Sequence, residues 1–314
     1  MFNELLSTMR VVALPTKTNF RGVTVREVAL FRGEYGWGEF SPFLEYGDEE
    51  SSQWLASAIE AATTPRPQQR RSRIPVNGTI PATNDKAVID RLVASYPGVK
   101  TFKVKVGENL AEDIVRLSRI RSIGRDINIR IDVNGNWSVQ DAITNLRAIY
   151  ENIGPLEYAE QPCGTVEELR ELKEKLIVNI PIAGDEVLRK AADPFAINLE
   201  GAIDILMLKV QPLGGIARAH ALAAHHKLPV VVSSALESAV GIHYGLTLAA
   251  SFSEMNFDCG LGTGSLLAAN VAELPIVNGQ IEITDVEPDF TGLEVSPERF
   301  EWWKNRVMKT AELL

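Results

Sequence analysis

The chain has 314 residues, of which 45% are hydrophobic and 23% charged, so it is large enough for a barrel of ordinary size plus a modest second domain. Its net charge of −9 argues against non-specific binding to nucleic acid or to an anionic membrane surface. Only two cysteines occur, the N-terminus lacks the pattern of a signal peptide, and no stretch is apolar over the roughly 18 residues of a membrane span, so we expect a cytoplasmic protein without a disulfide framework.

The first part of the chain does not follow a regular alternation of strands and helices. Residues 23–31 alternate like a strand, residues 33–38 have the composition of a turn, and residues 51–62 have the pattern of a helix. Residues 63–73 are rich in Pro, Gln and Arg, which is typical of a linker. We therefore expect residues 1–73 to belong to a small α+β capping domain that is distinct from the region beginning at residue 74.

From residue 74 the chain alternates between apolar runs and helical segments. The runs that we predict to be strands are 74–80, 101–106, 128–132, 156–160, 180–185, 203–209, 229–233 and 256–260. Asp193-Pro194 predicts the start of one of the intervening helices. Eight strands alternating with seven or more helices favour a closed α/β barrel of the TIM type over residues 74–274, with the arrangement (β/α)7β. Residues 275–314 return to a strand, turn and helix composition and are expected to rejoin the capping domain.

Five of the apolar runs end on a charged residue, at intervals of 24 to 28 residues. These residues are Lys105, Asp132, Glu160, Asp185 and Lys209. The interval is about the length of one strand-plus-helix unit, and a barrel of this kind carries its active site at the carboxyl ends of its strands. A charge that ends a buried run is costly unless it is paired or binds a metal. The pattern therefore predicts a site in which the five charges lie around one rim.

The three carboxylates of this set, Asp132, Glu160 and Asp185, predict a metal site. Hard oxygen donors without a neighbouring His or Cys suit Mg²⁺, and converging carboxylates would repel one another without a cation. The alternative is that each carboxylate caps the helix that follows its strand. That alternative fits Asp185 better than Glu160, because Glu is a weak cap.

The two lysines, Lys105 and Lys209, are the candidate catalytic bases, since a closed barrel would place them across the rim from each other. A nearby cation lowers the pKa of an ammonium group, and Lys103, on the same side of the strand as Lys105, is a candidate for this supporting charge. Arg130 is related to Asp132 in the same way. The alternative is that Lys103 and Lys105 only pair with the carboxylates. Lysines that lie beside a carboxylate-bound metal ion indicate a particular reaction: removal of a proton from the carbon next to a substrate carboxylate.

Weaker signals suggest where a substrate would lie. Ser233 and Ser234 end the seventh predicted strand, where they would hydrogen-bond to a substrate or cap the next helix. Gly262, in a Gly-Thr-Gly sequence after the eighth strand, suggests a loop that a substrate approaches closely.

The charged segments together resemble the enolase superfamily, in the subgroup of muconate lactonizing enzyme. The matching segments are Lys103-Val104-Lys105, Asp132-Val133-Asn134, Glu160-Gln161-Pro162, Gly184-Asp185-Glu186 and Leu208-Lys209. Within this subgroup the chain is most similar to the o-succinylbenzoate synthases of menaquinone biosynthesis, in the short form found in actinobacteria. The segments that add this likeness are residues 36–42 and 233–238, Phe20-Arg21-Gly22, and residues 262–267.

The resemblance implies a lyase that removes water from 2-succinyl-6-hydroxy-2,4-cyclohexadiene-1-carboxylate through an enediolate. It implies that Lys105 takes the proton next to the carboxylate and returns it to the departing hydroxide, while Lys209 stabilises charge on the opposite face. Mg²⁺ would be held by the three carboxylates. The only partner implied is this small carboxylate substrate, and the oligomeric state is left open, a monomer included.

Other functions remain open from the sequence. Racemisation of N-acylamino acids would use the same two lysines, whereas dipeptide epimerases carry an Asp-x-Asp pattern that Asp258-Cys259-Gly260 lacks. Muconate cycloisomerases tend to be longer chains. From other classes, a metal-free lyase would form an imine on Lys209, and a non-catalytic barrel would show decay in the charged set, which is complete here.

Overall fold

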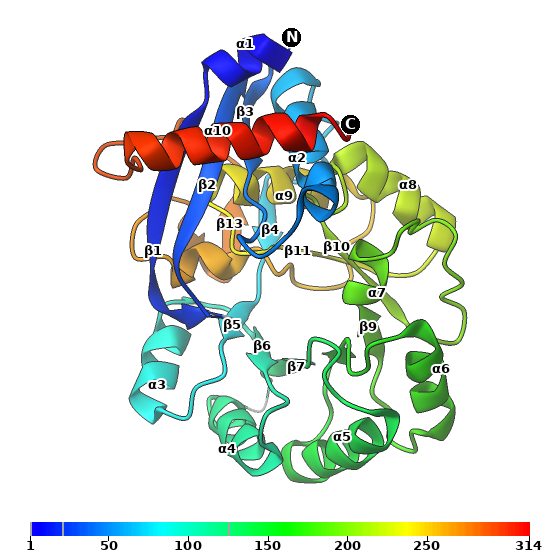
Figure 1. Ribbon diagram of the computed structural model, residues 1–314. Helices are drawn as coiled ribbons and strands as arrows, with labels where there is room; N and C mark the ends of the chain where they lie inside the picture. The colour runs from blue at the N-terminus through cyan, green and yellow to red at the C-terminus, as the bar shows by residue number, and fades with distance from the viewer. Residues whose placement is uncertain (1, 21, 125) are drawn as a thin grey trace.

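Seven short parallel strands form the centre of the fold in the computed structural model, which describes residues 2–20, 22–124 and 126–314. Neighbouring strands in the sheet are also neighbours in the sequence, and the sheet curls so that its strands surround a common interior (Figure 1). The strands are β5 (Gly78–Ile80), β6 (Thr101–Lys105), β7 (Asn128–Asp132), β8 (Tyr158–Glu160), β9 (Ile182–Gly184), β10 (Ile205–Lys209) and β11 (Val230–Ser233). The predicted parallel α/β fold is confirmed.

A helix follows each of these strands, and the helices lie around the outside of the curled sheet (Figure 1). They are α3 (Lys86–Ala94), α4 (Leu110–Arg121), α5 (Val139–Ile153), α6 (Val166–Lys175), α7 (Glu186–Arg189), α8 (Ile216–His226) and α9 (Ala239–Ser251). Most begin at a side-chain cap, such as Thr165 before α6, which forms a full capping box with Glu168. Among the helices of the described residues, none combines the length and the apolarity of a membrane span.

The helix predicted at Asp193-Pro194 is wrong. The helix between β9 and β10 is α7, which begins directly after Asp185 and lasts one turn. Asp193 only accepts a hydrogen bond from the backbone of Phe195, within a turn. The chain then turns again at Gly201, which has a φ of +69°, and this leaves too few residues for a helix before β10.

The strand predicted at 256–260 is also wrong in its extent. Only two bridges remain, from Cys259 to Val76 and from Gly260 to Ser233. The backbone amide of Cys259 donates to Pro75 (2.8 Å) and that of Gly260 donates to Val232 (2.8 Å), so these two residues join the two edges of the curled sheet. We call residues 259–260 the seam. The seam is short because the chain turns at Leu261 into the 3₁₀-helix η1 (Gly262–Leu266).

The N-terminal residues form an antiparallel sheet with its own core. The sheet consists of β1 (Arg10–Phe20), β2 (Val23–Gly33) and β3 (Gly36–Phe40), preceded by α1 (Phe2–Ser7) and followed by α2 (Asp48–Thr63). Helix α10 (Pro297–Ala311) crosses this sheet at the top of Figure 1. Trp303 of α10 packs in a buried cluster with Phe40 and Trp54. The last helix of the chain therefore packs with the N-terminal elements.

The rest of the tail pairs elsewhere. Strands β12 (Ile276–Val277) and β13 (Gln280–Glu282) form a small antiparallel sheet with β4 (Arg73–Pro75), at the start of the parallel region. Only from residue 293 onwards does the tail bond to β1, where the amide of Ala13 donates to Leu293 at 2.9 Å. The division into 1–73, 74–274 and 275–314 stays a prediction. Arg21 of the Phe20-Arg21-Gly22 segment lies outside the described residues.

Candidate active site

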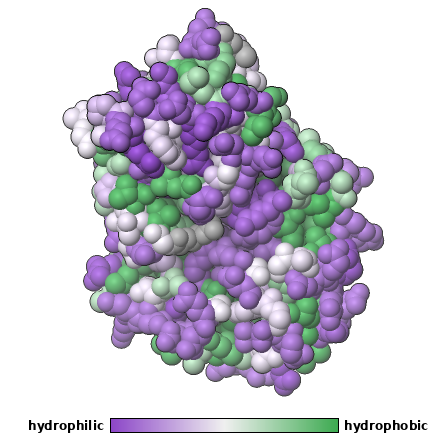
Figure 2. All heavy atoms as spheres, in the orientation of Figure 1, coloured by the Kyte–Doolittle hydropathy of each residue, from purple (hydrophilic) through white to green (hydrophobic). Residues whose placement is uncertain are grey.

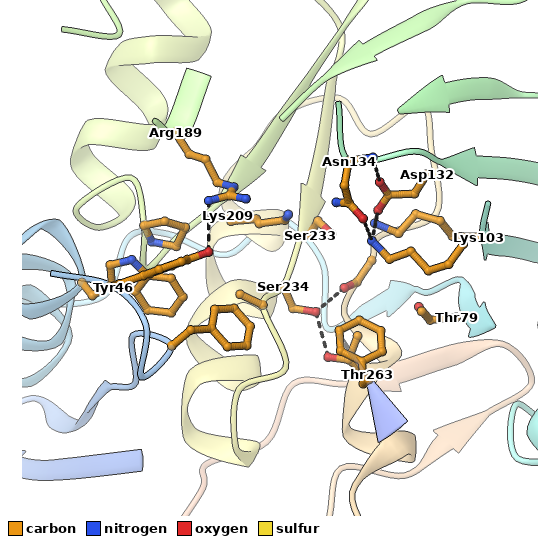
Figure 3. Close-up of a pocket in the computed structure, with 17 residues that line it drawn as sticks. Tyr46, Thr79, Lys103, Asp132, Asn134, Arg189, Lys209, Ser233, Ser234 and Thr263 are labelled. Atoms are coloured by element: carbon orange, nitrogen blue, oxygen red, sulfur yellow. Dashed lines mark hydrogen bonds and ion pairs between the residues drawn. The ribbon is translucent and has the colours of Figure 1, made fainter. Parts of the chain in front are cut away.

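The five charged residues predicted to share a rim lie at the same edge of the curled sheet. Lys105 is in register with Asp132 across β6 and β7, and Asp132 is in register with Glu160 across β7 and β8. Asp185 follows β9 directly, and Lys209 is the last residue of β10. Lys103, Lys105, Asp132 and Lys209 line one pocket (Figure 3). Parallel strands bring their carboxyl ends together, which is why residues so far apart in the sequence meet here.

On one side of the pocket, the lysines of β6 contact two of the carboxylates. Lys105 Nζ lies 2.5 Å from Asp132 Oδ2 and 2.8 Å from the side-chain oxygen of Asn134. Lys103 Nζ lies 3.0 Å from Glu160 Oε2 and 3.3 Å from Asp132 Oδ2. Burial lowers the pKa of Lys105, and the neighbouring charge of Lys103 lowers it further, which outweighs the opposing effect of Asp132. An amine with a lowered pKa is a better base near neutral pH.

Lys103 has the opposite shift. Burial would lower its pKa, but Glu160 and Asp132 together raise the pKa well above its usual value. Lys103 therefore stays charged, which is what a supporting cation beside Lys105 requires.

The three carboxylates are almost completely buried. Burial and the neighbouring charge of Asp132 raise the pKa of Glu160 above its usual value. For Asp132 and Asp185, burial acts in the same direction, but the adjacent lysines lower the pKa overall. Asp185 stands at the N-cap of α7 without capping it by its side chain, and α6 takes its cap from Thr165, so helix capping does not account for these residues.

On the other side of the pocket, Lys209 pairs with Asp185, and an arginine joins the pair. Lys209 Nζ lies 2.5 Å from Asp185 Oδ2, and Arg189 Nε approaches the same oxygen at 3.3 Å. Arg189 also reaches N-terminal residues. It donates to the hydroxyl of Tyr46 (3.4 Å; Figure 3) and lies 3.8 Å from the carboxylate of Glu50. Arg189 is not among the residues predicted from the sequence. The available signal was its position four residues after Asp185, since such residues are neighbours on a helix.

The two serines lie in the pocket wall. Ser234 Oγ donates to the carbonyl of Gly260 (2.5 Å) and shares a hydrogen bond with Thr263 Oγ1 (2.8 Å). Helix α9 is capped by Ser238, so neither Ser233 nor Ser234 caps it. Gly262 does not line this pocket, and a Cβ there would lie 2.8 Å from the backbone oxygen of Asn77. Gly260 and Thr263 line the pocket instead.

Arg130 lies beneath the pocket rather than in it. Its guanidinium is buried, donates to Asn77 (2.9 Å) and to the carbonyl of Asp258 (2.7 Å), and forms an ion pair with Glu157. Its ring neighbour is Tyr158, at 4.8 Å. These contacts stabilise the layer of the sheet interior below the charged rim, and a direct supporting role towards Asp132 stays a prediction.

The chemistry of the carboxylate set fits a hard divalent cation. Asp132, Glu160 and Asp185 offer oxygen donors from three neighbouring strand ends, which is the kind of ligand that a hard divalent cation prefers. In residues 2–20, 22–124 and 126–314, no three His, Cys, Asp or Glu side chains converge closely enough to form a metal-binding group. Lysines contact Asp132, Glu160 and Asp185 there instead.

Aromatic side chains from the N-terminal part close the pocket opposite the charged rim. These are Phe20, Phe43, Tyr46 and Trp54. The indole nitrogen of Trp54 is buried and has no hydrogen-bond partner among the described residues. The face of the molecule seen in Figure 2 is mostly hydrophilic in its middle, between the N-terminal sheet and the helices α4 to α6. Apolar walls with a few placed polar groups are typical of small-molecule sites.

Comparison with known proteins agrees with this fold. Residues 87–297 match the family model described as "Enolase C-terminal domain-like", and residues 11–62 match "Enolase N-terminal domain-like". Two solved structures share the fold at 20% identity. They are muconate lactonizing enzyme from Pseudomonas putida, with a TM-score of 0.71 over 94% of this chain and 97% of that chain, and the L-Ala-D/L-Glu epimerase from Bacillus subtilis, with a TM-score of 0.74 over 91% and 98%.

Curated relatives are much closer in sequence. The chain is 49% identical to an o-succinylbenzoate synthase of Mycobacterium leprae, over 99% of this chain and 93% of that protein. It is 47% identical to an o-succinylbenzoate synthase of Mycobacterium tuberculosis, over 99% and 95%. The chain belongs to the o-succinylbenzoate synthase family of the enolase superfamily.

Proposed function

We propose that this protein catalyses the Mg²⁺-dependent syn-dehydration of 2-succinyl-6-hydroxy-2,4-cyclohexadiene-1-carboxylate to 2-succinylbenzoate, as a hydro-lyase. The observation that carries the proposal is that Lys105 and Lys209 face one pocket together with Asp132. The relatives named o-succinylbenzoate synthase, 47% to 49% identical over nearly the whole chain, support the choice of substrate.

Lys105, the last residue of β6, would carry the proton in this reaction. Lys105, whose pKa is lowered by burial and by Lys103, would take the proton from the carbon next to the substrate carboxylate. The ammonium would then give this proton to the departing hydroxide, so that water leaves from the same face and the ring becomes aromatic. Lys209 approaches from the opposite side of the pocket and would stabilise the negative charge of the enediolate.

The three carboxylates would hold the metal. Mg²⁺ bound there would supply positive charge that makes the carbon next to the substrate carboxylate more acidic. Lys105 and Lys209 would have to give up their contacts with Asp132 and Asp185 in that state, and both amines would then be available to the substrate. The two ion pairs thus mark the side chains that would rearrange.

The proposed function also gives a meaning to the two parts of the fold. We infer that the curled sheet, joined by the seam, is the (β/α)7β barrel, and that the N-terminal sheet with α2 and α10 is its cap. The aromatic residues Phe43, Tyr46 and Trp54 reach the pocket from the N-terminal part, which supports this arrangement. Ser233 and Ser234 would contact the substrate from the barrel side, and we keep the expectation that the protein acts in the cytoplasm.

The test is a direct assay with metal-stripped protein and the cyclohexadiene substrate, with and without Mg²⁺, in which absorbance follows the aromatic product. We expect turnover that depends on Mg²⁺ and is lost in Lys105→Ala. Lys100→Ala is the matched control, because Lys100 lies just before the same strand but is exposed and pairs only with Asp126. Turnover that is independent of Mg²⁺, or unchanged in Lys105→Ala, would contradict the proposed mechanism.

Racemisation of N-acylamino acids is the second candidate. The observation in its favour is that lysines approach the pocket from two different strands, β6 and β10, as a two-base exchange of a proton requires. If the wild-type protein with Mg²⁺ does not dehydrate the cyclohexadiene, it should be tested with N-acylamino acids for loss of optical rotation. An imine on Lys209 is tested by borohydride with substrate, which should leave Lys209 unmodified.

A further inference from the structure

Two segments that are distant in the sequence meet in a buried polar cluster beside the pocket. One is residues 36–42, which contain β3, and the other is residues 233–238, which follow β11. Glu39 of the first segment is 3% exposed and is surrounded by hydrogen-bond donors. We call this group of interacting side chains the Glu39 cluster, and its members are Glu39, Ser41, Gln211 and Ser238.

The carboxylate of Glu39 accepts hydrogen bonds at both oxygens. Oε2 accepts from Ser238 Oγ (2.5 Å) and from the backbone amide of Gly241 (2.9 Å). Oε1 accepts from Ser41 Oγ (2.7 Å), from the amide of Ser238 (3.2 Å) and from Gln211 Nε2 (3.3 Å). A buried carboxylate is costly unless hydrogen bonds replace its water, and bonds to a charged acceptor are among the strong ones. The contacts of Glu39 are therefore difficult to exchange for others.

Two of these donors, Gln211 and Ser238, come from two different loops of the parallel sheet. Gln211 is two residues after Lys209, in the loop between β10 and α8. Ser238 ends the loop that begins with Ser233 and Ser234, between β11 and α9. The carboxylate of Glu39, on the N-terminal sheet, thus contacts two loops. One follows the candidate catalytic lysine Lys209 in the sequence, and the other contains the pocket residue Ser234.

The second loop is held in a conformation that it would not favour by itself. Leu236 has a φ of +64°, in the left-handed region, which is unfavourable for a residue other than glycine. Its carbonyl accepts a hydrogen bond from Nε of the buried Arg26 (3.1 Å), and Arg26 lies on β2. The same guanidinium donates to the carbonyl of Ser41. The N-terminal sheet therefore supplies the contacts that compensate for this strain.

We infer that Glu39 is a positioning residue that fixes the Lys209 loop and the Ser233–Ser234 loop relative to each other. Glu39 does not line the pocket, so it acts through these loops rather than on the substrate. The inference rests on the proposed function only for its consequence in catalysis, since the contacts themselves are independent of the substrate.

Hydrogen–deuterium exchange measured by mass spectrometry tests the inference without any substrate. In Glu39→Gln, an NH₂ group replaces one carboxylate oxygen and faces hydrogen-bond donors, so contacts to the two loops are lost. We expect peptides over 205–216 and 232–242 to exchange at least tenfold faster. Glu27→Gln is the matched control. Glu27 lies on β2 and accepts from Trp303 Nε1 (2.6 Å) and Arg299 Nε (2.7 Å), so its loss disturbs the contact between the N-terminal sheet and α10 and leaves the two loops bound to Glu39. Faster exchange confined to the N-terminal sheet in Glu39→Gln would overturn the inference.

Single-contact variants extend the test to catalysis and remain usable if Glu39→Gln does not fold. We expect Gln211→Ala to lower kcat several-fold with little change in KM, because its loop carries Lys209. Ser238→Ala is expected to raise KM several-fold, because its loop carries the pocket serines. Ser138→Ala, which removes the capping hydroxyl of α5, controls for the loss of a helix cap and should change neither. Identical kinetics in Gln211→Ala, Ser238→Ala and the wild type would overturn the inference. An inactive wild type would reject the proposed function, and the exchange experiment would still decide the role of Glu39.

Discussion

The two sides of the pocket are built in different ways. On the Lys105 side, the polar contacts come from strand ends of the parallel sheet: Lys103 lies on β6, Asp132 on β7, and Asn134 just after β7. On the Lys209 side, the pair with Asp185 is joined by Arg189, and Arg189 reaches Tyr46 and Glu50 in the N-terminal part of the chain.

The difference shows how far each side depends on the packing of the N-terminal elements. The Lys105 side follows from the register of neighbouring strands, which is fixed by burial of their apolar residues. The Lys209 side depends in addition on contacts between elements that are distant in the sequence. Disturbing the N-terminal part should therefore affect the function of Lys209 more than that of Lys105.

The largest expected effect separates the two lysines. We expect Lys105→Ala to lower kcat by about 10⁴-fold, since it removes the group that moves the proton. Lys209→Ala should lower kcat by about 10²-fold, because it removes only charge stabilisation. Steady-state kinetics with the cyclohexadiene substrate measures both. Equal losses would show that the two sides share the proton transfer and would contradict the assigned roles.

The carboxylates should show a loss of metal binding that is measured without turnover. Glu160→Gln removes a buried charge from the centre of the set, and we expect the affinity for Mg²⁺ to fall by at least about 10²-fold in calorimetry. Glu151→Gln provides the control, since Glu151 is exposed and forms an ion pair with Arg147 on α5, away from the pocket. Unchanged binding in Glu160→Gln would remove Glu160 from the proposed metal site.

A smaller effect tests the contact between Arg189 and the N-terminal part. Arg189→Met removes the guanidinium from Asp185 and from Tyr46, and we expect kcat to fall by about tenfold with a loss of about 1–3 kcal/mol of stability. Tyr46→Phe removes one 3.4 Å hydrogen bond and should change kcat less than Arg189→Met. If Tyr46→Phe had the larger effect, Tyr46 would act on the substrate rather than through Arg189.

A further expected effect is on the pH dependence of stability. Burial and the nearby Glu39 raise the pKa of Glu237 to about 7 from its usual 4.5. The folded protein then holds a proton that the unfolded chain has lost, so stability falls as the pH rises from 4.5 to 7, by about 3 kcal/mol at most. Glu237→Gln should remove this fall, which denaturant unfolding at pH 5 and pH 8 would measure. An identical pH dependence in both proteins would contradict the raised pKa.

The parts of the site that the sequence could predict are those with a local signal. Each charge of the rim stands at the end of an apolar run, and the nearly constant interval shows that the runs are equivalent strands. Lys103 follows from the two-residue period of a strand. The two-residue period did not predict the position of the Arg130 guanidinium. It gives the face of the strand on which a side chain lies but not the depth at which a long side chain ends.

The parts that the sequence could not predict depend on contacts between distant segments. Nothing near Glu39 indicates that its carboxylate accepts from Ser238, and nothing near Arg189 indicates Tyr46. The extent of the predicted eighth strand, 256–260, was wrong for a related reason. The alternation of strands and helices predicts a strand at 256–260, but the number of paired residues depends on where the chain must turn, and here it turns directly after Gly260.

The seam has a consequence for the order of folding. Cys259 pairs with Val76 and Gly260 with Ser233, so the first of these pairs connects segments that are very far apart in the chain, while the other strands of the sheet pair with their sequence neighbours. Closing so long a loop costs more conformational entropy than pairing adjacent units. At the seam, a few backbone hydrogen bonds, such as those donated by Cys259 and Gly260, offset this cost. The open, sequentially paired sheet should therefore form first, and the joining of its two edges should be the late step that completes the pocket wall at Gly260.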